Sequence, residues 1–293
     1  LILLVLAGVI VAFERLFSRA KFTADEALVG EPIQYSLGKW RFPAIGFVSL
    51  TFLLSVGAPL LALGDWATDG LLRTTRGGYP LTIDREQVWE STWNTFSISV
   101  LAGIVAVLAI LPIAFLIARY KSRIGSIAHS IIIATFALPG ILIALAMRFW
   151  TLRSDWAYDL VNNTEVLLIF AYIVRFGSLA MGILLVAVSA VPKRLHEAGK
   201  ILGVNRISRF ARIDLPIMAP GLGAAAGLVI LSTMKELPIT LLISPLGFST
   251  LATRIFSSFE DAFVAEAGIM ALILVGLSSI LTWFLVIRRS DHL

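Results

Sequence analysis

The chain has 293 residues, of which 58% are hydrophobic and only 15% are charged. A soluble domain has about 45–50% apolar and about 25% charged residues, so this composition excludes an ordinary soluble domain and indicates a membrane protein. The absence of cysteine excludes disulfides, thiolate metal sites and cysteine nucleophiles. The net charge of +5 could suggest a nucleic-acid partner. Basic residues that gather in short loops between apolar runs orient a membrane protein instead, so we expect no nucleic acid to bind.

Long apolar runs predict an all-α integral membrane protein. A helix needs roughly 20 mostly apolar residues to cross about 30 Å of hydrocarbon, and these runs lack the alternation typical of strands. The predicted complete spans lie at 42–63, 92–118, 124–149, 165–191, 216–243 and 262–287. The chain opens at Leu1 inside a further apolar run, 1–13, which we expect to be a partial span that ends a preceding unit.

The segments between the spans fall into two sets by charge. Sixteen of the 24 Lys and Arg residues lie in every second segment, and only five lie in the others. The basic segments are 14–41, 119–123, 192–215 and 288–293. The positive-inside rule puts these segments in the cytoplasm. We therefore predict a cytoplasmic linker at 14–41, a six-span unit at 42–287 and a cytoplasmic C-terminal tail.

Ordinary helix signals divide the basic segment 192–215 into two short helices. Pro192 suits a first helical turn, and Gly203 suits the left-handed position that ends a helix. Asn205 is a suitable N-cap for a second, amphipathic helix on the membrane surface, and Pro216 then opens the next span. The apolar face of the first helix is formed by Leu195, Ala198, Ile201 and Leu202. On composition alone, a loop that only holds topology and touches anionic lipid stays open.

The order of residues in this segment resembles a known motif. Glu197-Ala198, Gly203 and Ile213-x-Leu215-Pro216 give the order E-A-x₄-G-x₉-I-x-L-P. It resembles the EAA motif, E-A-A-x₃-G-x₉-I-x-L-P, of permease subunits from binding-protein-dependent ABC importers. The departure is Gly199, which stands where the family usually has a second Ala and weakens the helix by roughly 1 kcal/mol.

The resemblance implies a bacterial inner-membrane permease with several partners. In that family the motif forms a cytoplasmic coupling helix that docks in a groove of a separate ATP-binding subunit, here expected as a dimer. Leu195, Ala198 and Ile201 would enter the groove, and Gly203 would turn the chain back toward Pro216. An extracytoplasmic substrate-binding protein is expected to dock on the loop 64–91. The chain has no G-x-x-x-x-G-K-[ST] sequence, so we expect neither enzymatic activity nor a cofactor.

A second stretch of the sequence suggests which substrate is transported. Met234–Phe256, MKELPITLLISPLGFSTLATRIF, resembles permeases of ferric iron importers. In those proteins two six-span halves are often fused, which implies ferric iron as cargo and 1–13 as the last span of a first half. The second permease unit would be fused upstream or separate. Permeases for thiamine, phosphonate, sulfate and molybdate share the architecture, so these cargoes stay open.

Ionisable residues inside spans are candidates for the translocation pathway, because such groups are costly in lipid. Arg175 lies in mid-span, so we expect it to face the bundle interior or a cavity, in a functional role or in a buried inter-helix pair. Lys235 and Glu236 are predicted near the outer end of their span, where a pathway role and a self-satisfied pair are both open. No metal site is predicted, because the histidines lack ligand spacing; they are His129, His196 and His292.

Two other classes of membrane protein account for less of the sequence. An ion-coupled secondary transporter would use interrupted helices and carboxylates near the midplane, but we expect no Asp or Glu deep in a span. A membrane enzyme would need His, Asp or Glu clustered at one membrane face, and the sequence suggests no such cluster. Neither class explains the order of residues from Glu197 to Pro216.

Overall fold

The computed structural model describes residues 37–72, 75–76, 79–80, 84–192, 194–195, 197, 201 and 203–287. The partial span predicted at 1–13, most of the linker and the tail at 288–293 lie outside these residues. The chain divides into two compact units, Leu1–Leu63 and Gly64–Leu293, and each is described by itself.

The first unit contains one long helical stretch. A 3₁₀ turn, Gly38–Trp40, leads into α2 (Arg41–Phe52), a π-helical turn (Leu53–Gly57) and α3 (Ala58–Leu72), whose last residues belong to the second unit. The stretch Gly38–Thr68 is long and apolar enough to cross a membrane, which confirms the span predicted at 42–63.

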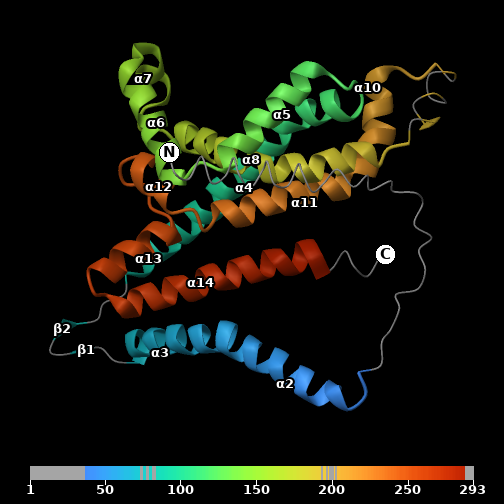
Figure 1. Ribbon diagram of the computed structural model, residues 1–293. Coiled ribbons are helices and arrows are strands. Elements are labelled where there is room, and N and C mark those ends of the chain that lie inside the picture. The colour runs from blue at the N-terminus through green and yellow to red at the C-terminus, as the bar shows by residue number, and fades with distance from the viewer. Residues whose placement is uncertain are drawn as a thin grey trace. The chain divides into compact units, whose positions relative to one another are not determined.

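The second unit is built mainly of helices (Figure 1). In chain order they are α4 (Arg85–Ala118), α5 (Arg123–Phe136), α6 (Gly140–Arg153), α7 (Asp155–Val161), α8 (Glu165–Ser189), α10 (Arg206–Arg209), α11 (Leu215–Thr233), α12 (Pro238–Ile243), α13 (Leu251–Glu260) and α14 (Val264–Thr282). Two short antiparallel strands, β1 (Thr75–Arg76) and β2 (Tyr79–Pro80), pair with Thr75 opposite Pro80. Five helical stretches of the described chain can span a membrane, and counting α5 and α6 as one bent span gives the six that were predicted.

The core of the second unit lies among α4, α8 and α11. Side chains such as Ala102, Leu184 and Val229 are fully buried there. A Cβ at Gly103 of α4 would lie 2.5 Å from Ile230 Cγ1 of α11, so glycine lets these two helices approach closely. Small residues at such crossings are typical of membrane helices, where close packing replaces the hydrophobic effect.

The span predicted at 124–149 is not one continuous helix. It is broken between α5 and α6, whose axes differ by 111°. The break falls at A-L-P, because Pro139 has no N–H to continue the ladder and disfavours helical backbone at Leu138. Apolar residues continue on both sides of Pro139, so the length of the run predicts a single helix although the proline interrupts it.

The span predicted at 216–243 is also different. Pro216 lies in the first turn of α11, as predicted, but helical backbone already runs from Arg206 through a π-helical turn (Phe210–Asp214), so the span is continuous with the helix before it. The same helix ends ten residues before Ile243, and α12 follows after a break. Pro238 is the first residue of α12, a position where its missing N–H needs no helical partner.

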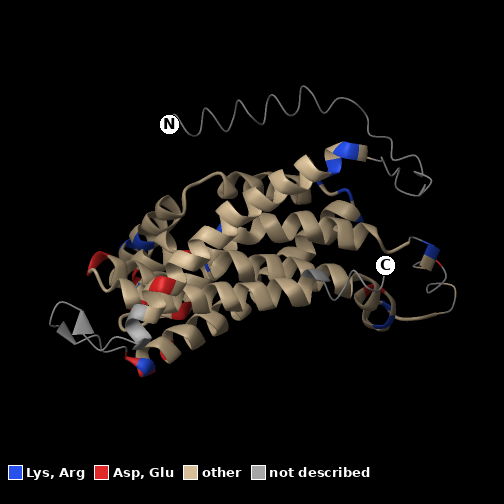
Figure 2. Ribbon diagram, turned by 90° about the horizontal axis from the view of Figure 1, so that it is seen from below, with Lys and Arg blue, Asp and Glu red and all other residues tan. Residues whose placement is uncertain are grey.

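The helices carry most of their charge near their ends (Figure 2). The segments predicted to be cytoplasmic meet at one end, where the Arg119 guanidinium donates to the Val191 carbonyl over 2.7 Å. The segments predicted to be outside meet at the other, where the Leu251 N–H donates to Thr95 Oγ1 over 2.7 Å. Which end faces the cytoplasm stays a prediction from charge.

Candidate functional site

Several local features of the segment 192–215 agree with its helix signals, although its second helix is continuous with α11 and not a separate surface helix. The Leu195 N–H donates to the Pro192 carbonyl, and the described residues between them and Gly203 are helical at 194, 195, 197 and 201. Gly203 has φ +68°, the left-handed conformation that glycine adopts without a steric cost. The Asn205 side chain accepts a hydrogen bond from the Ser208 N–H over 2.6 Å, so the predicted N-cap is confirmed. Ala198 lies outside the residues whose structure is described.

This segment exposes apolar side chains that a basic loop does not need. Ile201 is 86% exposed and Leu195 is 38% exposed, and the charged Glu197 is exposed as well. Ile207, on the other side of the Gly203 turn, is 82% exposed. Scattered exposed apolar residues are common, but large ones on a short charged helix favour a partner surface or lipid.

The second half of the segment is continuous with a membrane span. Ile213 lies in the π-helical turn, and Leu215 and Pro216 begin α11 without a gap. The Phe210 ring packs against the Phe115 ring of α4, with centroids 6.0 Å apart. This half is therefore one continuous helix with α11 and also packs against α4.

Arg175 of α8 donates hydrogen bonds to the backbone at the break between α5 and α6, which we call the first helix break. Its Nη1 donates to the Phe136 carbonyl over 2.7 Å and also to the Leu138 carbonyl, and its guanidinium lies over the Phe136 ring. Arg175 is ten residues into the 25-residue α8, about 15 Å along its axis. Backbone carbonyls freed at such depth have no water to accept from, so Arg175 supplies the missing donors. The expectation that Arg175 faces the interior is confirmed.

Glu236 lies at the second helix break, between α11 and α12, and its carboxylate also lies against the first break, between α5 and α6. Its Oε1 accepts from the Ile239 N–H of α12 over 3.3 Å and lies 2.6 Å from where a Cβ of Gly140 would stand, at the start of α6. The carboxylate thus lies at the positive ends of α6 and α12, which favours a negative charge. The Arg175 charge acts on it as well. We call Arg175, Glu236 and Gly140 the helix-break cluster.

The buried ring of Tyr172 adds a polar contact beside this cluster that the sequence analysis missed. Its hydroxyl lies 2.6 Å from Thr240 Oγ1, and the Thr240 hydroxyl donates to the Glu236 carbonyl over 2.7 Å. The expectation that no carboxylate lies deep in a span is wrong for Glu236. The reason is that α11 ends early, so Glu236 stands at the depth of the first break rather than near the surface.

Lys235 is not part of the helix-break cluster. It lines a cavity with residues of α14, including Ser278, Ser279 and Thr282. The structure therefore brings two of the three candidate pathway residues together and places the third elsewhere. The description of Lys235 and Glu236 as a self-satisfied pair is wrong, because Glu236 bonds to the Ile239 N–H and no ion pair joins the two neighbours among the described residues.

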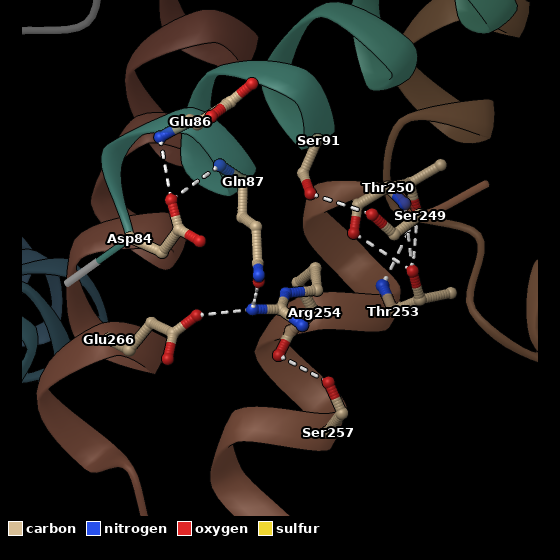
Figure 3. Close-up of polar contacts among 10 residues, drawn as sticks. All are labelled: Asp84, Glu86, Gln87, Ser91, Ser249, Thr250, Thr253, Arg254, Ser257 and Glu266. Atoms are coloured by element: carbon tan, nitrogen blue, oxygen red, sulfur yellow. Dashed lines mark hydrogen bonds and ion pairs between the residues drawn. The ribbon is translucent and has the colours of Figure 1, made fainter. Parts of the chain in front are cut away.

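At the opposite end from the segment 192–215, polar residues from three helices bond together (Figure 3). Arg254 of α13 donates to Gln87 of α4 and pairs with Glu266 of α14 over 2.8 Å. A second contact joins Ser91 Oγ to Ser249 Oγ over 3.0 Å. This outer network was not predicted, because its members are separated by up to 167 residues and no local pattern links them. Asp84, the last residue of the described loop before α4, caps that helix by accepting from the Glu86 and Gln87 N–H groups.

Comparison with known proteins gives a family match. A model of the family described as "Binding-protein-dependent transport system inner membrane component" matches residues 110–289. This range includes both helix breaks and the segment 192–215.

Individual relatives of this chain are also permease proteins. The "Fe(3+)-transport system permease protein FbpB 2" of Haemophilus influenzae is 30% identical over 277 residues, which cover 93% of this chain and 53% of that protein. The "Diacetylchitobiose uptake system permease protein DasC" of Streptomyces coelicolor is 25% identical over 61% of this chain and 63% of its own length. The chain thus spans about half the length of the iron relative.

A solved structure supports the fold. A chain of the inward-facing MetNI methionine ABC transporter superposes with a TM-score of 0.55, covering 69% of this chain and 96% of that chain. The sequence identity is 17%, so the likeness concerns the fold alone.

Proposed function

The chain belongs to the family of binding-protein-dependent transport system inner membrane components, and on that premise we propose that it forms the translocation pathway of an ATP-driven importer, coupled through 192–215 to a separate ATP-binding subunit. Its partners would be a dimer of that subunit, an extracytoplasmic substrate-binding protein and a second permease unit. The iron relative is nearly twice as long as this chain, which supports a second unit fused upstream through a linker at 14–41.

One observation carries the coupling proposal. The E-A-x₄-G-x₉-I-x-L-P order lies within the family match, and its Gly203 adopts a left-handed turn between two helical pieces. The turn leaves Leu195 and Ile201 exposed and is followed, from Arg206, by one helical stretch that includes α11. An apolar helix face that fills a groove is a common mode of recognition between proteins.

Replacing Ile201 tests this proposal without disturbing the fold. Because Ile201 is 86% exposed, Ile201→Asp removes no packing inside this chain. We expect it to abolish copurification of the ATP-binding subunit and uptake, while the protein still inserts. The matched control is Ile207→Asp, the same change at an 82% exposed position outside the first helix. Normal copurification and uptake by the Ile201 variant would refute the coupling role.

For the cargo, ferric iron is the first candidate, with thiamine, phosphonate, sulfate and molybdate as alternatives. The support is the resemblance of Met234–Phe256 and the iron relative that matches 93% of this chain. Uptake of radioactive ferric iron should be compared in cells with and without this gene, against unlabelled thiamine, phosphonate, sulfate and molybdate. Iron uptake that does not depend on the gene would reject iron and leave the importer assignment standing.

A further inference from the structure

Three ionisable residues lie at the interrupted helices, and two of them are already engaged. Arg175 closes the carbonyl end of α5, and Glu236 lies against the first turns of α6 and α12. Lys235 has neither a hydrogen-bond acceptor nor a carboxylate partner among the described residues. It is therefore the charge that has no partner within the described part of this chain.

Lys235 lies well inside the membrane layer. A Cβ at Gly227 of α11 would touch Leu285, so these two residues mark the same depth on antiparallel helices. Lys235 follows eight residues later and lines a cavity with Leu274–Trp283 of the span Val264–Leu285. The middle of that stretch is about 10 Å from the Leu285 end and about 21 Å from the Val264 end. Hydrocarbon at that depth does not solvate an ammonium group.

The cavity beside Lys235 is open, and hydroxyl-bearing residues of α14 stand in a wall that is otherwise mainly apolar. It has a volume of about 420 Å³, and the residues that line it include Ser278, Ser279 and Thr282. The Ser278 hydroxyl is buried and has no hydrogen-bond partner within the described chain. The Thr282 hydroxyl donates to the Ser278 carbonyl, which leaves its oxygen free to accept. An unpaired cation at membrane depth indicates water or a polar ligand beside it, because lipid does not solvate the charge.

We infer that this cavity is a water-filled part of the translocation pathway in which Lys235 attracts an anionic cargo. The inference rests on the proposed importer function and names the class of substrate. Sulfate, molybdate and phosphonates meet the requirement directly. Ferric iron meets it when its carboxylate or phosphate ligands give the complex a net negative charge. A bare ferric ion and the thiamine cation do not, because the Lys235 charge would repel both.

Thiol labelling can test the inference without knowing the cargo. The chain has no cysteine, so Ser279→Cys introduces one thiol at the cavity. The full-length protein would be studied with its partners in membrane vesicles, with any other cysteines replaced by serine. The rates of labelling by an anionic and a cationic methanethiosulfonate are each divided by the rate with a free thiol in solution. We expect this corrected rate to be about tenfold higher for the anionic reagent, because a charged cleft concentrates ions of opposite sign.

Variants of Lys235 identify the source of the preference. Lys235→Gln should bring the corrected rates close together, and Lys235→Arg should keep them apart. The matched control, Lys121→Gln, removes the same charge from the exposed turn before α5 and should leave the preference unchanged. Comparing two reagents at one thiol cancels any effect of Lys235 on thiol ionisation. The adjacent Ile280→Cys, 67% exposed on another face of α14, measures labelling outside the cavity.

Two outcomes would overturn the inference. Labelling of Ser279→Cys no faster than that of Ile280→Cys would mean that water does not fill the cavity. A preference that survives Lys235→Gln would mean that Lys235 does not create it. Neither outcome touches the importer assignment, which fails separately if Ile201→Asp leaves ATPase binding and uptake intact.

Discussion

The helix-break cluster and the segment 192–215 both lie where helices are interrupted. They differ in how the free backbone groups at the helix ends find hydrogen-bond partners. In the cluster, contacts between distant parts of the sequence hold the chain, such as Arg175 with the end of α5. In the segment, the bonds are local, within three residues at Asn205, and large apolar side chains stay exposed. The environment explains the difference, because water can satisfy a helix end at the surface and cannot do so inside hydrocarbon.

The contrast predicts two kinds of failure. A change in the helix-break cluster should first affect folding, since it leaves buried polar groups without partners. A change in the segment 192–215 should first affect coupling, since its side chains contribute little to the packing of this chain. Folding and coupling can be measured separately on the same variant, by thermal unfolding of the purified protein and by cargo transported per ATP hydrolysed.

The largest effect is expected from Arg175→Gln. The shorter amide loses the charge-assisted bonds to the Phe136 and Leu138 carbonyls, so stability should fall by about 3 kcal/mol or more. The measurement is the yield of monodisperse protein in detergent and its melting temperature. Arg153→Gln is the matched control, because Arg153 lies at the exposed end of α6 and stacks on Phe149. If both variants melt alike, the Arg175 bonds do not hold the break.

The sequence was sufficient for what depends on local pattern. The positions of α8 and α14, the left-handed Gly203 and the cap at Asn205 follow from apolar runs and helix signals, whereas α4 begins before the predicted span 92–118. The helix breaks could have been found too, since Pro139 and Pro238 mark both of them. They were missed because hydropathy averaged over a window of about 20 residues passes through a short gap.

The partners of the charged groups could not be predicted in the same way. No spacing links Arg175 to the Phe136 carbonyl or Arg254 to Glu266, because those contacts depend on how distant helices pack. Depth was also hidden, since counting residues from Pro216 placed Glu236 near the outer surface. Only the packing of α11 against α14 and of Glu236 against Gly140 shows how deep these groups lie.

Glu236→Gln should have an intermediate effect. The amide oxygen can still accept from the Ile239 N–H. The lost attraction to Arg175 and to the start of α6 is partly offset because a half-buried site no longer holds a charge, so the cost should be about 1.5 kcal/mol. Glu236→Ala removes the acceptor as well and should cost about 1 kcal/mol more. Melting temperatures of both variants give the comparison. Equal stability of the two would show that the charge, and not the bond to Ile239, is what matters.

The smallest effect on folding is expected from Gly203→Ala, which tests the left-handed turn within the segment 192–215. No atom lies within 4 Å of the added methyl, so the cost comes only from φ +68° and should be about 1 kcal/mol. Gly182→Ala is the matched control, since that position is equally open but lies within α8, where alanine gains about 1 kcal/mol.

If the turn at Gly203 transmits motion, its alanine variant should transport less cargo per ATP while the melting temperature changes little. Gly182→Ala should keep the ratio of cargo to ATP. A gain in stability at both positions would show that Gly203 is not left-handed in the working protein. The contrast between the two interruptions would then be lost, because the segment would be an ordinary helix with no turn to relay a push from the ATP-binding subunit to α11.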